Sequence, residues 1–384
     1  MAKFKHVLVK PYPAQGHVTS LQKLSHCIAD YGVNVTFVNT ESIHTRVMAT
    51  NLGLDEGSNS IKFIAIPDGL ETDEERKDST KPLESMSRVM PGHLQELIEK
   101  VKEYFMIANL AAGWVLEVAE RMGIERAGFW AASVSTLALN LHIPKLIEAG
   151  VIDNSGKGPE LNDLITILKD LPPYKSTDLT WSCPEDLRKQ KIFFGCALSI
   201  LHHSKRSNLF LYNSIHELEA SACSVIPGVL PIGPLIASSR LFHRRGSLWN
   251  EDSTCSNWLD QHPAQSVIYV AFGSLTVFSL EQFYELAHGL EQIAQSFLWV
   301  VRQDLTNGPL NGSFICDVWR VGLGVDGGEN GLITRQELRD KVLAVLGSDE
   351  IRANCLRVKE MARKSVSGGS SLKNLQSFIE LLKA

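Results

Sequence analysis

The stretch His6-Val-Leu-Val-Lys-Pro-Tyr-Pro-Ala-Gln-Gly-His17 decides the fold. Its first part, His6 to Lys10, is predicted to form a short buried strand, and the proline- and glycine-rich part that follows indicates a turn. Val18 to Tyr31 then has the apolar spacing of a helix. Because open α/β sheets bind ligands at the carboxyl ends of their strands, His17 is a candidate catalytic residue. The alternative is a histidine that only caps the helix or packs at its start.

Similar short apolar runs recur along the first part of the chain and alternate with helical patterns. The predicted strands are Val33 to Asn39, Ile61 to Pro67, Phe105 to Asn109, Arg126 to Trp130 and Leu209 to Asn213. The helical patterns between them include Leu83 to Glu103 and Trp114 to Met122. This alternation is typical of a parallel sheet wrapped by helices, so we expect an α/β domain over residues 1–235.

The second part of the chain contains fewer strand signals. A stretch rich in proline and glycine, Ile226 to Pro234, precedes a polar segment over 236–252, and together they are typical of a linker between domains. A second α/β domain is expected over 253–366, and a final helix over 367–384. A strand is predicted over Val267 to Phe272, and a helix over Leu280 to Gln295. Three later helices are predicted over Thr334 to Leu346, Glu350 to Ser365 and Ser370 to Lys383. Only one more strand is predicted, Phe297 to Arg302, and two strands are too few, since sheets usually contain about four to six.

Composition narrows the possible partners. The chain has 384 residues, of which 44% are hydrophobic and 21% are charged, which is typical of a soluble globular protein. A net charge of -5 without a lysine or arginine cluster argues against nucleic acid as a partner. No apolar run reaches the roughly 18 residues of a membrane span, and no secretory signal precedes the first strand, so we expect a cytoplasmic protein. The seven cysteines are scattered without a Cys-x-x-Cys pair, which argues against a disulfide framework or a zinc site, and we expect no metal.

Two glycine motifs permit more than one interpretation. Gly322-Leu-Gly-Val-Asp-Gly327 matches the dinucleotide fingerprint, but no strand precedes it and no helix follows, so the match is interpreted as accidental. A Rossmann dehydrogenase would need spaced glycines in the first turn, where this chain has prolines. Phe272-Gly-Ser274 ends a predicted strand and is either an anion-binding turn or an ordinary one.

Taken together, the chain resembles the plant family 1 UDP-glycosyltransferases, most closely their family 83 members. The matching strings are Pro11-Tyr-Pro-Ala-Gln-Gly-His17, Val35-Thr-Phe-Val-Asn-Thr-Glu41, Ile66-Pro-Asp-Gly-Leu70, Trp258-Leu-Asp-Gln261, Ser266-Val-Ile-Tyr-Val-Ala-Phe-Gly-Ser274, Phe297-Leu-Trp-Val-Val-Arg302, Phe314-Ile-Cys-Asp-Val-Trp319, Gly331-Leu-Ile-Thr-Arg335 and Gly368-Gly-Ser-Ser371. The resemblance covers nearly all of the chain.

The resemblance implies a GT-B arrangement of two Rossmann-like domains, the first binding the acceptor and the second the UDP-sugar, with the last helix returning to the first domain. It implies that His17 is the general base and that Gly16 and Ser274 lie on the donor side. No cofactor is implied, because the UDP-sugar is a co-substrate. The implied reaction moves a sugar, with glucose expected, to a hydroxyl of a small lipophilic acceptor of plant secondary metabolism, such as a flavonoid or another phenolic.

The chain departs from the family pattern at two places. Where the family has an aspartate that orients the histidine, the string here is Ile107-Ala-Asn109, and the chain has no aspartate between Asp78 and Asp153. The long donor motif beginning Trp-Ala-Pro-Gln is expected between Arg302 and Phe314 and is absent there. The second domain is therefore expected to be truncated by an internal deletion.

These departures leave three interpretations open. The chain is a UDP-glycosyltransferase whose activity is impaired or lost, or it is a non-catalytic remnant that binds the acceptor alone. The third is that the deletion reflects aberrant splicing or a mistaken gene model, because matching sequence continues on both sides of the join.

Overall fold

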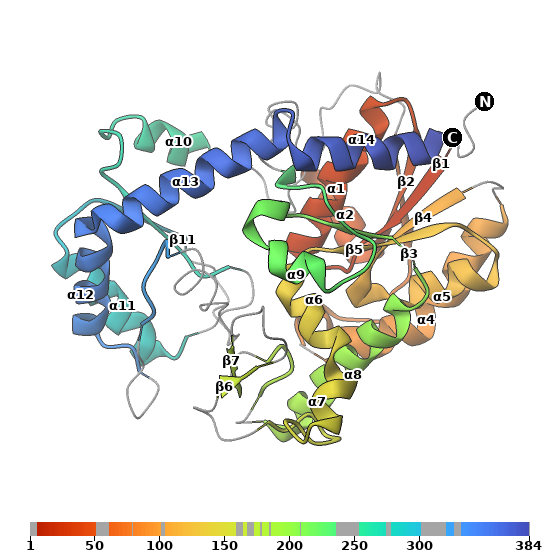
Figure 1. Cartoon of the computed structure of the whole chain (residues 1–384), viewed down its shortest axis with the longest axis horizontal. Helices are drawn as coiled ribbons and strands as arrows, with labels where there is room; N and C mark the ends of the chain where they lie inside the picture. The colour runs from red at the N-terminus through yellow and green to blue at the C-terminus, as the bar shows by residue number, and fades with distance from the viewer. Residues whose placement is uncertain are drawn as a thin grey trace. The chain divides into compact units, whose positions relative to one another are not determined.

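The protein consists of two compact units. The computed structural model describes residues 6–50, 61–78, 80–100, 104–158, 164–166, 173–176, 179–183, 186–207, 209–235, 253–273, 278–300, 320–325 and 332–383. Unit 1 comprises Met1–Asn250 and Met361–Ala384, and unit 2 comprises Glu251–Glu360 (Figure 1). The segment 236–252, predicted to be a linker, lies outside the described residues.

Unit 1 is built on a parallel sheet of seven strands in the order β3-β2-β1-β4-β5-β8-β9. The strands are β1 (His6–Lys10), β2 (Asn34–Thr40), β3 (Ile61–Ile66), β4 (Tyr104–Asn109), β5 (Arg126–Trp130), β8 (Phe210–Tyr212) and β9 (Val229–Pro231). Strand β4 is buried along its whole length, as expected where helices cover both faces of a parallel sheet. Strand β9 lies within the stretch Ile226 to Pro234, so the prediction that this stretch is part of a linker is wrong for Val229–Pro231, which pair with β8.

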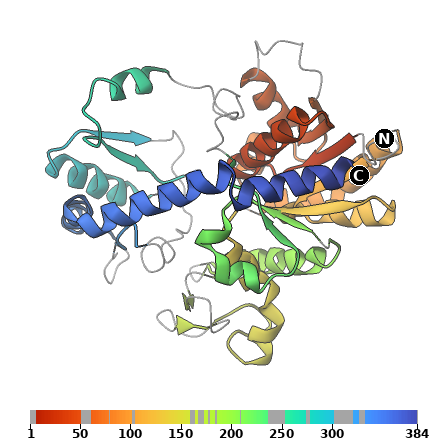
Figure 2. The ribbon, with the colours of Figure 1, turned by 45° about the horizontal axis from the view of Figure 1, so that its top comes forward.

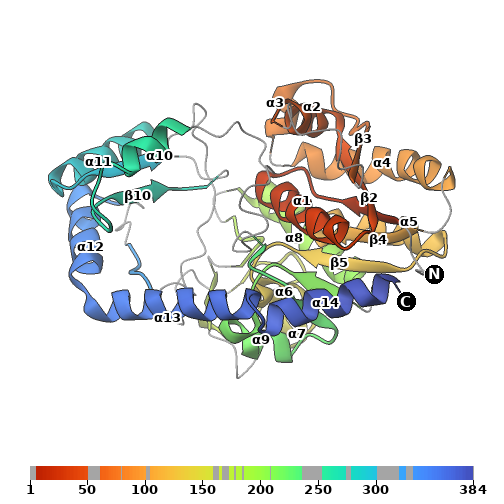
Figure 3. The ribbon, with the colours of Figure 1, turned by 90° about the horizontal axis from the view of Figure 1, so that it is seen from above.

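Helices cover both faces of this sheet. They are α1 (Gln15–Asp30), α2 (Glu41–Thr50), α3 (Asp73–Lys77), α4 (Lys81–Glu99), η1 (Leu110–Ala112), α5 (Trp114–Arg121), α6 (Val134–Leu141), α7 (Ile143–Glu148), α8 (Leu187–Ser204), η3 (His216–Leu218), α9 (Ala220–Ser224) and α14 (Ser370–Lys383). On one face, α1 and α14 bury apolar side chains such as Leu21 and Phe378 against Val9 and Phe37 (Figure 3). The last helix of the chain is therefore part of the core of unit 1.

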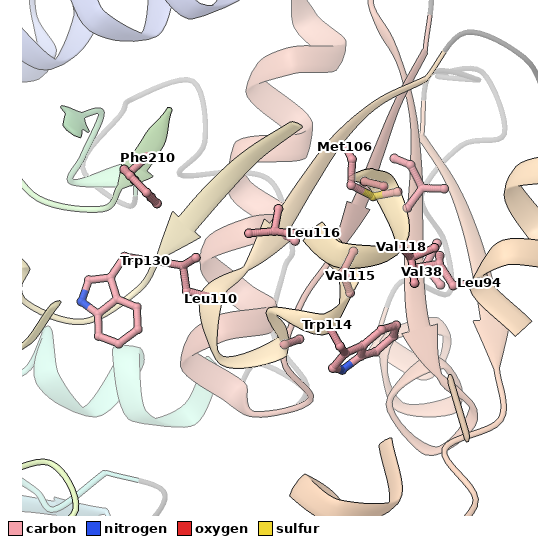
Figure 4. Close-up of a cluster of buried hydrophobic side chains, with 14 of the residues drawn as sticks. Val38, Leu94, Met106, Leu110, Trp114, Val115, Leu116, Val118, Trp130 and Phe210 are labelled. Atoms are coloured by element: carbon pink, nitrogen blue, oxygen red, sulfur yellow. The ribbon is translucent and has the colours of Figure 1, made fainter. Parts of the chain in front are cut away.

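The opposite face of the sheet packs against α4 and α5. Figure 4 shows this core, with Phe210 and Trp130 at one end, Leu110 and Leu116 between, and Leu94 at the other end. A third cluster joins α7 and α8 to the small hairpin of β6 (Leu164–Ile165) and β7 (Tyr174–Lys175). Unit 1 thus has a continuous apolar interior on both sides of its sheet.

Unit 2 has a much smaller interior. Its described elements are α10 (Ser253–Leu259), β10 (Ile268–Ala271), α11 (Leu280–Gln292), β11 (Phe297–Val300), α12 (Arg335–Gly347) and α13 (Asp349–Val366), the last of which continues into unit 1. Strands β10 and β11 pair in parallel, and Figure 2 shows them side by side. The buried apolar residues of the described part of unit 2 are Leu286, Leu290 and Ile293. Across the described residues, no helix is long and apolar enough to cross a membrane.

Candidate functional site

The turn after β1 carries the candidate base. Helix α1 begins at Gln15, so Gly16 and His17 lie in its first turn. The backbone amide of His17 donates to the carbonyl of Ala14 at 3.0 Å, and the amide of Ala14 donates to the carbonyl of Tyr12 at 2.8 Å. Two successive tight turns therefore bring the His17 ring to the carboxyl edge of the sheet, where the sequence predicts it.

The imidazole of His17 is partly buried. The ring of Tyr12 packs edge-on against it, with the ring centroids 5.4 Å apart. The Nδ1 atom of His17 is buried and has no hydrogen bond in the described structure. Burial lowers the pKa of His17 to about 4, because a low-dielectric environment disfavours the charged ring. His17 is therefore neutral at pH 7, as a general base must be, but it is a weak base.

Asn109 lies at the end of β4, beside the turn. In the register of the two strands, Lys10 pairs with Ala108, so Asn109 is level with Pro11. Its side chain is fully buried, and its Oδ1 accepts from the amide of Ala111 at 3.0 Å, which caps the short helix η1. The Asn109 side chain interacts with His17 and raises the pKa of the imidazole, but burial has the larger and opposite effect.

The Nδ2 atom of Asn109 is buried without a hydrogen-bond partner in the described structure, like Nδ1 of His17. A carboxylate at this position would offer a charged acceptor to the imidazole. The amide of Asn109 carries no charge, and its Oδ1 already accepts the capping hydrogen bond from Ala111. The pair is therefore brought together as the sequence predicts, but its hydrogen bonding is incomplete.

Lys10 is a third polar residue at this edge, and no motif of the sequence predicts its role. Its side chain is 1% exposed, and its Nζ donates to the carbonyl of Pro11 at 2.9 Å. Burial lowers the pKa of Lys10 to about 7, and the nearby carboxylate of Asp68 raises it less. Asp68 itself is held by the guanidinium of Arg76 at 3.1 Å. The sequence feature that could have predicted a role for Lys10 is a charged residue at the end of an otherwise apolar strand.

The remaining predicted site residues are Gly16 and Ser274. Gly16 is exposed, and a side chain there would meet nothing within 4 Å, which leaves room for a ligand beside the first turn of α1. Ser274 lies outside the described residues. Within the parts of the chain that the structure describes, no group of three or more His, Cys, Asp or Glu side chains could hold a metal ion.

Comparison with known proteins identifies the family. UDP-glycosyltransferase 83A1 of Arabidopsis thaliana is 32% identical to the chain, and the alignment covers 99% of the chain and 97% of that protein. The chain belongs to the plant UDP-glycosyltransferases. This alignment runs over 450 positions, whereas the chain has 384 residues. In at least 66 positions (450 minus 384), a residue of the relative therefore has no counterpart in this chain. No protein-family model matches the chain.

Solved structures of plant UDP-glycosyltransferases share the fold, which is GT-B. Medicago truncatula UGT71G1, complexed with UDP-glucose, superimposes with a TM-score of 0.79 at 16% identity, over 100% of this chain and 99% of that one. Os79 from O. sativa, in complex with UDP, gives 0.77 at 19% identity, over 98% and 100%. These structures hold UDP or a UDP-sugar, in agreement with a co-substrate rather than a cofactor.

Proposed function

We propose that this UDP-glycosyltransferase moves glucose from UDP-glucose to a hydroxyl of a small lipophilic acceptor, such as a flavonoid or another phenolic, and does so slowly. Unit 1 binds the acceptor and unit 2 the UDP-sugar. The observation that carries the proposal is the neutral His17 at the carboxyl edge of a complete parallel sheet, in a chain that aligns with a plant UDP-glycosyltransferase over nearly all of both lengths.

In the proposed reaction, His17 takes the proton of the acceptor hydroxyl as its oxygen attacks C1 of the sugar. The C1–O bond to UDP breaks, and the configuration at C1 inverts. An alcohol is a poor nucleophile at neutral pH, so a base positioned at the hydroxyl contributes about 10² to 10⁴ in rate. Gly16, which has open space around it in the first turn of α1, and Ser274 are proposed to contact the donor.

Asn109 explains why the reaction should be slow. When the imidazole accepts a proton, it becomes positively charged in a buried place, and the Asn109 amide has no charge to offset it. The comparable replacement of the aspartate in a serine protease triad costs about 10⁴ in rate. With a pKa of about 4, His17 also has little driving force to accept a proton from a phenol.

Binding of the UDP-sugar is proposed to be impaired as well. We place the gap in the alignment with the relative between Arg302 and Phe314, where the donor motif of the family is expected and is absent. Residues 301–319 lie outside the described structure, so this placement rests on the sequence. A shortened donor site predicts weak binding of UDP-glucose and a high KM for it.

The experiment is to compare the chain with its N109D variant in transfer from UDP-glucose to a panel of phenols, followed by mass spectrometry. We expect N109D to raise kcat by about 10²-fold or more, because a carboxylate stabilises the imidazolium. The matched control is N109D/H17A, in which the gain should vanish. Equal turnover by N109D and by N109D/H17A would contradict the proposed role of His17.

A second candidate function is acceptor binding without transfer. The proposed loss of the donor motif and the Asn109 replacement both favour it, because each would remove part of the catalytic machinery while unit 1 keeps its sheet and core. Calorimetry on the whole chain distinguishes the candidates. Phenol binding without detectable UDP binding supports an acceptor-binding protein, and micromolar affinity for UDP excludes it.

A further inference from the structure

The first turn of α1 carries His17 but lacks the usual means of fixing a helix start. Its N-cap residue is Ala14, whose side chain makes no capping bond, and the turn has no acidic residue. Helix starts without a cap are less stable by about 1 kcal/mol and tend to fray. Since fraying here would move the candidate base, some other contact must hold this turn.

A chain of hydrogen bonds supplies that contact. The Oγ of Ser20, in the second turn of α1, donates to the carbonyl of Gly16 in the first turn at 2.7 Å. The Nδ2 of Asn213 in turn donates to the Oγ of Ser20 at 3.3 Å. Asn213 follows directly after β8, so it projects from the rigid edge of the sheet where the strands end.

The other end of the Asn213 amide is also engaged. Its Oδ1 accepts from the amide of Leu235 at 2.9 Å. Leu235 is buried in the same core as Val18 and Leu21 of α1, and it is the last described residue before the segment 236–252. One amide therefore joins the start of α1 to the point at which the described chain leaves the sheet.

The segment before Leu235 is fitted closely around Asn213. The amide of Gly233 donates to the carbonyl of Ser214 at 2.9 Å. A Cβ atom on Gly233 would lie 2.6 Å from the Oδ1 and the backbone carbonyl carbon of Asn213. Such a separation is far below van der Waals contact, so only glycine allows this close approach.

We propose that Asn213 is a positioning residue for His17, since its amide fastens the uncapped first turn of α1 to the end of β8 and to the Ile232–Leu235 segment. The proposal rests on the role of His17 given above. Asn213 acts through Ser20 and the backbone of Gly16, and it is not proposed to touch the acceptor or the UDP-sugar. Its function is to keep the imidazole in its partly buried position.

The test is a histidine NMR titration of the whole chain, with the His17 signal assigned from the H17Q variant. In the parent protein, His17 should remain neutral down to pH 5, because its pKa is about 4. In N213A, and equally in S20A, a loosened turn admits water to the ring. Its pKa should then move by at least one unit towards the ordinary value of about 6.5.

Two further variants make the test specific. N140A removes a buried asparagine whose Oδ1 accepts from Thr180, elsewhere in unit 1, and should leave the titration of His17 unchanged. The double variant S20A/N213A should shift the pKa of His17 no further than either single change, because each single change already breaks the hydrogen bond between Asn213 and Ser20.

If His17 stays neutral at pH 5 in both N213A and S20A, the proposal is wrong. S20A removes a single hydroxyl and keeps the test available should N213A fail to fold. The readout requires no sugar transfer, so a chain that proves inactive would affect the proposed function and leave this result standing.

Discussion

Units 1 and 2 come from one chain, yet their described parts differ sharply in what they bury. Unit 1 places seven parallel strands between helices and has a core on each face of its sheet. The described part of unit 2 has two strands and three buried apolar side chains, and Tyr269 and Val300 of its strands are 67% and 50% exposed. The comparison teaches that the same strand signal gives a buried strand where other strands flank it and helices cover both faces, as for β4, and a half-exposed strand among the described elements of unit 2.

The largest expected effect separates the cores of the two units. Phe37 on β2 is fully buried, so F37A should lower the free energy of unfolding by about 3–5 kcal/mol. The matched variant F297A acts on β11, where Phe297 is 37% exposed, and should cost less than about 1 kcal/mol. Urea unfolding followed by circular dichroism measures both. Similar costs for the two variants would mean that β11 is packed as tightly as β2.

The next largest effect is expected from Lys10, because burying its charged ammonium group in the core lowers the free energy of unfolding. The unfolded chain keeps Lys10 protonated up to a pKa of about 10.4, whereas the folded protein does so only to about 7. Between these values the unfolded state binds more protons, so the stability of the folded protein should rise with pH. K10M should therefore be more stable than the parent at pH 7, by roughly 4 kcal/mol, and its stability should not rise with pH in this range.

The control for K10M is K62M, which removes an exposed lysine of β3. Urea midpoints measured at pH 7 and pH 10 should show the rise with pH in the parent and in K62M, and not in K10M. A rise that persists in K10M would assign the effect to another group.

His17 should make unit 1 sensitive to acid in a related way. Its folded pKa of about 4 lies below the ordinary value of about 6.5. The unfolded state therefore binds the extra proton first, and stability should fall as the pH is lowered from 6.5 towards 4. H17Q should reduce this fall by about 2–3 kcal/mol between pH 6.5 and pH 4, as seen in urea midpoints at the two pH values. An unchanged pH profile in H17Q would show that the ring is solvated.

The smallest expected change in stability comes from replacing one glycine by alanine in each unit. Gly195 in α8 has open space around the position of a Cβ, so G195A should stabilise unit 1 by about 0.5–1 kcal/mol through helix propensity. In α11 of unit 2, a Cβ on Gly289 would lie 2.8 Å from Leu338 and 3.1 Å from the carbonyl oxygen of Arg335 on α12. G289A should therefore destabilise unit 2, measured by thermal unfolding. Stabilisation by both changes would mean that α11 and α12 can separate freely.

Much of the fold could be predicted because apolar periodicity is strong in unit 1. Strand β5 and helix α14 lie at Arg126–Trp130 and Ser370–Lys383, where the sequence predicts them. Strand β9 was missed because its Pro231 is read as a breaker, although an edge strand tolerates a proline. Helix α8 was missed because its apolar spacing is irregular and it contains Gly195, whereas its Asp186 cap was a usable signal.

The candidate site could be predicted only in part. His17 was predicted because it follows the first strand, and Asn109 because it stands where the resembled family has an aspartate. The structure brings the two together because parallel strands place their carboxyl ends at one edge of the sheet. Lys10 was missed because its burial depends on the helices packed over β1. Asn213 was missed because its role depends on Ser20 and Leu235, 193 and 22 residues away along the chain.

Hydrogen exchange measured by mass spectrometry on the whole chain tests the central claim most directly, namely that the core of unit 1 is far more extensive than the core of the described part of unit 2. We predict that amides of β4 and β5 exchange only through global unfolding, over hours or longer, and that amides of β10 and β11 exchange within minutes. Equal and slow exchange in all four strands would contradict the account, because it would show that unit 2 has a core as complete as that of unit 1.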